Sequence, residues 1–337
     1  MLSESSKRLG RRGRLLVRTL ILLLLAGGMG GARGKSAEEP KRGNDSGISR
    51  VGATDLGLSD SGASGPAEER RAEVGKGGSV EVRRRVEIVA HRGASWDAPE
   101  NTLASLRLAW EQQADAIEMD CFLSRDGQIV VIHDADTRRT AGISGRVADL
   151  TFEQLRRLDV GRWKDPRFSG ERIPSLAEAL QTVPAGKRAF IEIKCGPEIL
   201  PELGRVLKAS GLKPEQTVII SFSEQVIAAV KKQYPERPAL WIAALTPRNG
   251  QGQARKVEDV IATARRIGAE GVDLSADARV LTAEYARAIR QAGLFLAVWT
   301  VNDVELARTM IRVGVQSITT DRPGWLREQL GRVHPRP

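Results

Sequence analysis

The chain has 337 residues, of which 41% are hydrophobic, and 52 Lys and Arg against 42 Asp and Glu give it a formal net charge of +10. This hydrophobic content excludes a chain that is disordered throughout, and the presence of only two cysteines excludes a disulfide framework and a four-cysteine zinc site. The positive charge alone would favour nucleic acid or an anionic membrane as a partner, so its distribution along the chain matters.

Residues 1–34 carry a net charge of +6 and contain the apolar run 20–26, which is followed by small residues. A basic segment, a short apolar run and small residues in this order are typical of a secretory signal peptide. The run is short for a membrane span, which needs about 20 residues. We therefore expect an exported protein, periplasmic or extracellular. An uncleaved N-terminal membrane anchor is the alternative, and would be the only membrane contact.

Residues 35–85 hold ten basic and nine acidic side chains, and all fourteen aromatic residues of the chain follow residue 85. A segment rich in glycine, serine and charged residues and without aromatic side chains cannot bury enough surface to fold, so 35–85 is interpreted as a disordered linker. The folded domain is expected over 86–330, followed by a tail at 331–337. Residues 86–337 have a net charge of only +3 and no basic helix face, so nucleic acid is not expected as a partner.

After residue 85, short β-branched runs alternate with stretches of helical spacing. Strands are expected at 86–90, 116–122, 189–194, 217–221, 240–243, 271–274, 295–299 and 316–319. Helices are expected at 102–113, 175–182, 197–209, 223–234, 257–267, 282–291 and 304–313. Eight strands separated mostly by helices over about 250 residues predict an α/β fold, the (β/α)8 TIM-type barrel. A doubly wound sheet is the alternative, but no glycine-rich phosphate fingerprint follows the first strand.

One further strand, at 128–133, follows the second strand after the turn signal Asp126-Gly127. A two-residue turn there would make it an antiparallel return strand added to the barrel, with His133 opposite Asp120. Residues 134–182 then form an oversized connection, which is expected to be a lid or small subdomain over the site.

Two of the three histidines, His91 and His133, fall at or just beyond strand ends, where a barrel keeps its active site. A single histidine in such a place is more often structural than catalytic. The pair is a better candidate, because each histidine is followed by a charged residue, Arg92 and Asp134 respectively.

Glu118 and Asp120 lie two apart on one expected strand, and Glu192 and Lys194 repeat this spacing on the next parallel strand. Side chains two apart on a strand share a face. Three carboxylates in one barrel mouth would repel each other unless a cation lay among them, and oxygen ligands favour Mg²⁺ or Ca²⁺. The alternative is that Glu192 and Lys194 merely pair inside the barrel.

The two cysteines, Cys121 and Cys195, each follow an inward-facing residue by one position and are expected to point outward, beneath the helices. They are interpreted as buried thiols, with a disulfide as the alternative in an exported protein. Trp299 could form an apolar wall for the substrate, or it could be a core tryptophan.

These residues occur in ordered motifs: His91-Arg92-Gly93-Ala94, Pro99-Glu100-Asn101-Thr102, Glu118-x-Asp120, Asp126-Gly127, His133-Asp134, Ile173-Pro174-Ser175-Leu176, Glu192-x-Lys194, Trp299-Thr300-Val301-Asn302 and Thr320-Asp321-Arg322-Pro323. Over roughly residues 86–328 the combination resembles the glycerophosphodiester phosphodiesterase family. The resemblance implies a TIM-type barrel that hydrolyses small-molecule glycerophosphodiesters to sn-glycerol 3-phosphate and an alcohol with a divalent cation.

By the same resemblance, His91 and His133 are the acid–base pair, and Arg92 and Lys194 contact the phosphate. The metal ligands would be Glu118, Asp120 and Glu192. Two departures from the family pattern, Gln113-Ala114-Asp115 and Arg322 in place of an aromatic residue, bear on substrate preference. The nucleophile is left open between water and the glycerol 2-hydroxyl. A related lipid phosphodiesterase of the lysophospholipase D type and a non-catalytic glycerophosphate-binding barrel are the alternative functions.

Overall fold

The computed structural model describes residues 85–247 and 253–331. The expected signal segment, nearly all of the linker and the tail lie outside these described residues. The strands are β1 Glu87–Ala90, β2 Ala116–Leu123, β3 Ile129–Val131, β4 Arg188–Ile193, β5 Thr217–Ser221, β6 Ala239–Ala243, β7 Gly271–Ser275, β8 Phe295–Trp299 and β9 Ser317–Thr320. The α-helices are α1 Leu103–Glu111, α2 Arg138–Ala141, α3 Phe152–Arg156, α4 Leu176–Leu180, α5 Leu200–Ser210, α6 Glu224–Gln233, α7 Val257–Arg266, α8 Ala283–Gln291, α9 Val304–Val313 and α10 Pro323–Gly331.

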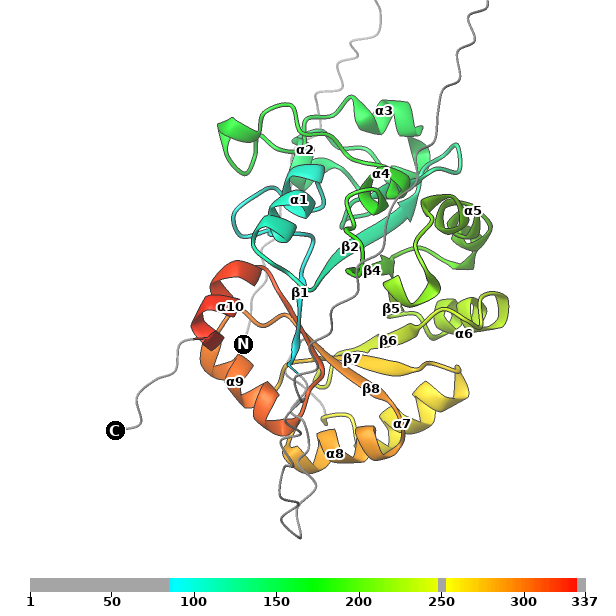
Figure 1. The fold of residues 1–337 in the computed structure, drawn as a ribbon. Coiled ribbons are helices and arrows are strands. Elements are labelled where there is room, and N and C mark those ends of the chain that lie inside the picture. The colour runs from blue at the N-terminus through cyan, green and yellow to red at the C-terminus, as the bar shows by residue number, and fades with distance from the viewer. Residues whose placement is uncertain (1–84, 248–252, 332–337) are drawn as a thin grey trace, which may run out of the picture. The chain divides into compact units, whose positions relative to one another are not determined.

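Eight parallel strands close into a barrel in the order β1-β9-β8-β7-β6-β5-β4-β2, and pairing of β1 with β2 completes the ring. The longer helices lie around the outside of the strands (Figure 1). The expected (β/α)8 barrel with an added antiparallel strand is thus confirmed. In the part of the chain that the structure describes, no helix is both long enough and apolar enough to span a membrane.

The strands are apolar on both faces because helices cover one side and the other side fills the barrel. The inward face supplies a compact cluster: Val89, Ala116, Phe190, Val218, Ile220, Leu240, Ile242 and Ala297. A larger cluster between strands and helices includes the apolar sides of α5, α6, α8 and α9. The barrel is therefore a packed core rather than a pore, and polar inward-facing residues near its carboxyl-terminal mouth stand out.

The hairpin between β2 and β3 has a different register from the expected one. Cys121 pairs with Val131, so that Ile132 rather than His133 lies opposite Asp120, to whose carbonyl the Ile132 N–H donates at 2.9 Å. The expected register is wrong by one residue, because Gly127 takes a left-handed conformation (φ +76°) and adds a third residue to the loop. His133 consequently lies beyond the end of β3.

Residues 134–173 form a small subdomain within the expected range of 134–182, whereas α4 at the end of that range packs in the larger cluster between strands and helices. The subdomain contains α2, α3 and the 3-10 turns Val147–Asp149 and Pro166–Phe168, and it has its own apolar cluster with β3. Lys164 Nζ donates to the carbonyl of Ser95 at 2.9 Å, and Arg167 Nη2 donates to the carbonyl of Asp97 at 3.1 Å. These bonds tie the lid to the loop after β1, beside the mouth of the barrel.

Candidate active site

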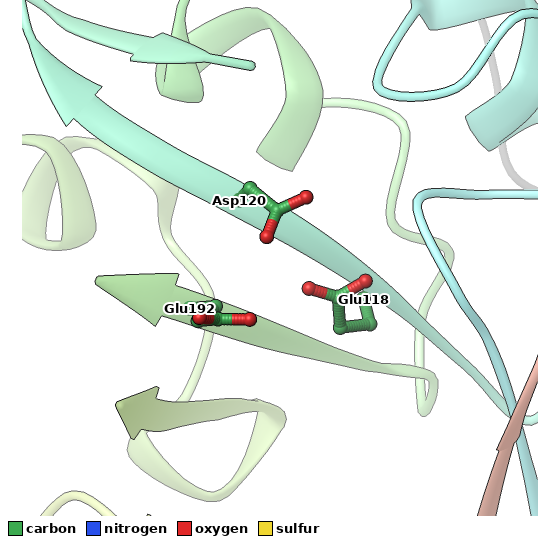
Figure 2. A group of neighbouring side chains, drawn as sticks. All are labelled: Glu118, Asp120 and Glu192. Carbon is green, nitrogen blue, oxygen red and sulfur yellow. The ribbon is translucent and has the colours of Figure 1, made fainter. Parts of the chain in front are cut away.

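Three carboxylates meet at the mouth of the barrel, on the neighbouring strands β2 and β4 (Figure 2). Parallel pairing sets Asp120 beside Glu192, and Glu118 lies two residues before Asp120 on the same inward face. One oxygen from each of the three residues lies within 4.8 Å of the others, and all three side chains are buried. The expected grouping of these residues is what the structure shows.

The proximity of these carboxylates changes their acidity. Burial, together with the charges of Asp120 and Glu192, raises the pKa of Glu118 well above its usual value. Burial and the charge of Asp120 raise the pKa of Glu192 to about 7. Burial also acts to raise the pKa of Asp120, but the charges of Arg92 and Lys194 outweigh it and lower that pKa. The cluster therefore resists carrying three negative charges without added positive charge.

Two oxygens of the cluster, Glu118 Oε1 and Asp120 Oδ1, are buried and have no hydrogen-bonding partner among residues 85–247 and 253–331. Asp120 Oδ1 lies 3.4 Å from the Lys194 ammonium, whereas Glu118 Oε1 has no ion-pair partner among these residues. Buried carboxylate oxygens are almost always hydrogen-bonded, paired or bound to a metal. Three such side chains supply only oxygen ligands, which suit a hard divalent cation. The residues present fit a bound divalent cation, with Glu118, Asp120 and Glu192 as its ligands.

Two protein cations border the cluster. Lys194 Nζ lies 3.1 Å from Glu192 Oε1 and 3.4 Å from Asp120 Oδ1. Burial acts to lower the pKa of Lys194, but these two carboxylates outweigh it and raise the pKa. The side-chain Nε of Arg92 lies 3.3 Å from Asp120 Oδ2, and the backbone N–H of Arg92 donates to Glu118 Oε2 at 2.8 Å.

The backbone of Arg92 is held in an unfavourable conformation. Its φ is +56°, in the left-handed region that residues with a side chain seldom adopt. The bond to Glu118 holds the N–H of Arg92, and Ser105 Oγ donates to its carbonyl at 2.9 Å. Strain of this kind persists where surrounding contacts fix it, as is common at functional sites.

His91, directly after β1, is oriented by a residue far away in the sequence. Its Nδ1 lies 2.6 Å from Asp321 Oδ1, and Asp321 also accepts hydrogen bonds from Asn302 Nδ2 at 2.6 Å and Ser95 Oγ at 3.1 Å. Burial acts to raise the pKa of Asp321, but the bonds from His91, Asn302 and Ser95 outweigh it and lower the pKa to about 2. Asp321 is thus an ionised acceptor that fixes the ring of His91.

His133 has an equivalent brace from the lid. Its Nδ1 lies 2.6 Å from Asp134 Oδ1, and Asp134 Oδ2 accepts from Arg139 Nε at 2.6 Å. Arg139 also donates to both oxygens of Glu100, at 2.7 and 2.8 Å, and Glu100 in turn accepts from Arg92 Nη1 at 2.9 Å. A continuous chain of hydrogen bonds and ion pairs therefore joins His133 to Arg92.

The two histidines lie on the same acid cluster. When protonated, both His91 and His133 act to lower the pKa of Asp120. Burial lowers the pKa of His133, helped by Arg92 and Lys194 and opposed by Asp120. The structure thus brings together seven of the eight residues assigned to the site from the sequence: His91, Arg92, Glu118, Asp120, His133, Glu192 and Lys194.

Trp299 lies elsewhere at the mouth. Its ring contacts Phe222 edge to face, with centroids 5.4 Å apart, and its Nε1 donates to the carbonyl of Asp273 at 3.1 Å. It borders a cavity with Asp277 and Arg279, and it does not line the cavity beside His91. Cys121 and Cys195 are both free thiols, so the alternative of a disulfide is not what the structure has.

Sequence reasoning assigned no role to four residues that position the site: Asp321, Glu100, Asn101 and Arg139. Asn101 Nδ2 donates to Asp120 Oδ2 at 2.8 Å, and its Oδ1 accepts from the Asp120 N–H. Glu100, Asn101 and Asp321 belong to motifs noted in the sequence, and these motifs could have marked them as site residues. Their partners were not evident, since Asp321 is 230 residues from His91 and Arg139 is 39 from Glu100.

Comparisons with known proteins identify the family of the chain. Residues 91–325 match the Glycerophosphoryl diester phosphodiesterase family. A glycerophosphodiester phosphodiesterase of Caldanaerobacter subterraneus is 35% identical over 243 residues, which cover 70% of this chain and 94% of the relative. One of Bacillus subtilis is 30% identical over 257 residues, covering 71% and 84%. An Oleispira antarctica phosphodiesterase, solved with its product sn-glycerol-3-phosphate, is 27% identical, with a TM-score of 0.65 over 73% of this chain and 97% of that one.

A fourth acidic residue, Asp273, lies deeper in the barrel. It stands on β7 between Ile242 and Ala297 of the inner cluster, and its Oδ1 has no hydrogen-bonding partner among the described residues. Burial, with a contribution from Glu192, raises the pKa of Asp273 to about 8. Asp273 is therefore neutral in the folded protein at neutral pH.

Replacing Asp273 with Asn should change how stability depends on pH. The folded protein keeps the proton of Asp273 up to about pH 8, whereas an unfolded chain releases it near pH 4. The free energy of unfolding of the wild type therefore falls by up to about 1.4 kcal/mol per pH unit as the pH rises between these two values. We expect urea unfolding with EDTA present to show that Asp273→Asn gains stability over the wild type at pH 7 but not at pH 4. An equal difference at both pH values would contradict this.

Proposed function

Because the chain belongs to the glycerophosphoryl diester phosphodiesterase family, it is an enzyme that hydrolyses glycerophosphodiesters, and we propose that it does so with a bound divalent cation and with His91 and His133 as its acid–base pair. The observation that carries this proposal is the pair of histidines, each bonded to an aspartate at 2.6 Å, beside one buried cluster of three carboxylates. The products would be sn-glycerol 3-phosphate and an alcohol.

The protein's own cations would hold the phosphodiester. Arg92 and Lys194 border the carboxylate cluster, and both stay protonated there because neighbouring carboxylates raise their pKa despite burial. Fixed positive charge beside the phosphoryl oxygens stabilises the charge that builds up in the transition state. A Mg²⁺ or Ca²⁺ ion on Glu118, Asp120 and Glu192 would supply Lewis-acid charge neutralisation at the same point.

The histidines would move the protons. In each ring Nδ1 is engaged by an aspartate, so Nε2 is the atom left to face the substrate. One histidine would take the proton of the nucleophile, either water or the glycerol 2-hydroxyl, and the other would protonate the leaving oxygen of the alcohol. Each such transfer typically contributes about 10²–10⁴-fold to the rate. Burial acts to lower the pKa of His133, which favours the neutral ring, the form that accepts a proton.

The direct test is to assay the purified full chain on glycerophosphodiesters. We expect release of sn-glycerol 3-phosphate with added Mg²⁺ or Ca²⁺, its loss in EDTA, and recovery when the cation is restored. His91→Ala should lower kcat by about 10²–10⁴-fold with its fold intact by circular dichroism. Turnover that persists both in EDTA and in the His91→Ala variant would contradict the proposed mechanism. The absence of turnover with every glycerophosphodiester would contradict the proposed function.

Arg139 is a positioning residue, because it reaches the site only through Asp134 and Glu100. Removing such an outer partner commonly costs about 10–100-fold at comparable sites. Arg139→Ala should therefore lower kcat by about tenfold, and it should raise the pH at which His133 titrates in the kcat profile, because Asp134 loses its competing cation. Arg138→Ala is the matched control, since Arg138 is an exposed neighbour whose guanidinium donates to Ser144. Equal losses in the two variants would contradict this role.

We further propose that the protein is exported, as the basic and apolar pattern of residues 1–34 suggests. Expressed with its own N-terminus in a bacterial host, it should appear in the periplasm or the medium, and N-terminal sequencing of the product should begin near residue 34. A chain retained in the cytoplasm would count against export. A membrane-bound chain that keeps residues 1–34 would instead mean an uncleaved anchor.

A further inference from the structure

A cavity of about 380 Å³ opens beside His91, between the loop after β1 and the lid. Its lining consists of His91, Arg92, Ser95, Trp96, Glu100, Trp163, Lys164 and Asp321. None of the three clustered carboxylates belongs to this lining. If the enzyme acts as proposed above, one arm of the substrate lies near those carboxylates, whose oxygens and cation suit the glycerol hydroxyls. The other arm, the alcohol, then has this cavity to occupy.

The two carboxylates in the cavity wall are already paired. Glu100 accepts hydrogen bonds from Arg92 and from both ends of the Arg139 guanidinium. Burial acts to raise the pKa of Glu100, but these arginines outweigh it and lower the pKa. Asp321 is engaged by His91, Asn302 and Ser95. Neither carboxylate is therefore placed to receive a positively charged headgroup.

The wall contains one cation that no carboxylate balances. Lys164 forms no ion pair among the described residues, and its Nζ donates only to the carbonyl of Ser95 at 2.9 Å. An ammonium group has three donors, so two remain for a ligand. Lys164 is partly buried in the lid, where its charge is less screened than that of a fully exposed lysine.

The two tryptophans of the wall also face cations. The Trp96 side chain is 54% exposed, and the guanidinium of Arg322 lies 4.5 Å from its ring centroid and 4.1 Å from that of Trp325. Arg139 and Lys164 each lie 6.0 Å from the ring centroid of Trp163. Aromatic rings bind quaternary ammonium groups through their faces, and here positive side chains of the protein already lie near both rings, which disfavours a further cation. Arg322, noted in the sequence as a departure from an aromatic residue, thus adds positive charge behind this wall.

We propose that this cavity binds the alcohol moiety of the substrate and selects alcohols that carry a second negative charge in the form of a phosphate group, with Lys164 as the residue that recognises it. This inference rests on the proposed function and adds the substrate class to it. Glycerophosphodiesters with a cationic alcohol such as choline are the disfavoured class, because their positive group would meet Lys164 with no free carboxylate nearby.

The test compares three substrates with the purified full chain at low salt and saturating Mg²⁺ or Ca²⁺. Bis(glycerophospho)glycerol releases a phosphorylated alcohol, glycerophosphoglycerol releases a neutral one, and glycerophosphocholine releases a cationic one. We expect kcat/KM for the first to exceed that for glycerophosphocholine about tenfold, which is more than the factor of two from its two equivalent bonds. The preference should weaken as NaCl is raised, because salt screens the interaction.

Variants of Lys164 then assign the preference. Lys164→Met should lower the ratio of kcat/KM for bis(glycerophospho)glycerol over glycerophosphoglycerol about fivefold, as expected for one partly exposed charge pair. Lys164→Arg should keep the ratio. Arg162→Met is the matched control: it removes an exposed cation of the same segment that does not line the cavity, and it should leave the ratio unchanged.

The outcomes separate the two proposals. If the wild type cleaves all three substrates at similar kcat/KM, the anionic selectivity is wrong while the proposed function stands. If Lys164→Met lowers kcat/KM equally for all three, Lys164 contacts the scissile phosphate and the inference is overturned. If the wild type cleaves none of them, the proposed function fails and this inference fails with it.

Discussion

The mutual repulsion of three buried carboxylates is the constraint on which the site depends. Glu118, Asp120 and Glu192 are held together by strand pairing that also builds the barrel, so they cannot move apart without breaking the sheet. Arg92 and Lys194 form ion pairs with the cluster and partly offset this repulsion. Two carboxylate oxygens nevertheless have no hydrogen-bonding partner among the described residues. The remaining deficit of positive charge is what a bound divalent cation would satisfy. Repulsion that the fold maintains thus favours the binding of a cation at this cluster.

The groups around this cluster are fixed from two opposite parts of the chain. Asp321, just after the last strand, orients His91, and Asp134 in the lid orients His133. Arg139 and Glu100 link the lid side to Arg92, so that His133 and Arg92 are parts of one hydrogen-bonded network. Such bracing holds side chains in one rotamer before a ligand arrives, which reduces the reorganisation that the reaction requires.

Much of the barrel and of its acid cluster could be predicted from the sequence. The alternation of side chains along a strand is a local property, so the spacing of Glu118 and Asp120 already assigned both to one face. The position of Glu192 on the next parallel strand followed from the order of elements. The hairpin register could not be obtained this way, because whether Gly127 adopts a positive φ depends on how Ser124 bonds Gln128 across the turn. The positive φ of Gly127 shifts the register by one residue, so that His133 lies beyond the end of β3.

The sequence by itself determined the parallel barrel, the cationic and anionic residues at its strand ends, and the existence of a lid, because periodicity and turn chemistry act over a few residues. Only the tertiary structure decided which residues form hydrogen bonds with the side chains of the site. Closing the barrel places β9 beside β1 and so brings Asp321 to His91 across 230 residues. Folding of the lid likewise places Lys164 next to Ser95 and forms the cavity beside His91. These contacts depend on chain closure, whose outcome no local pattern encodes.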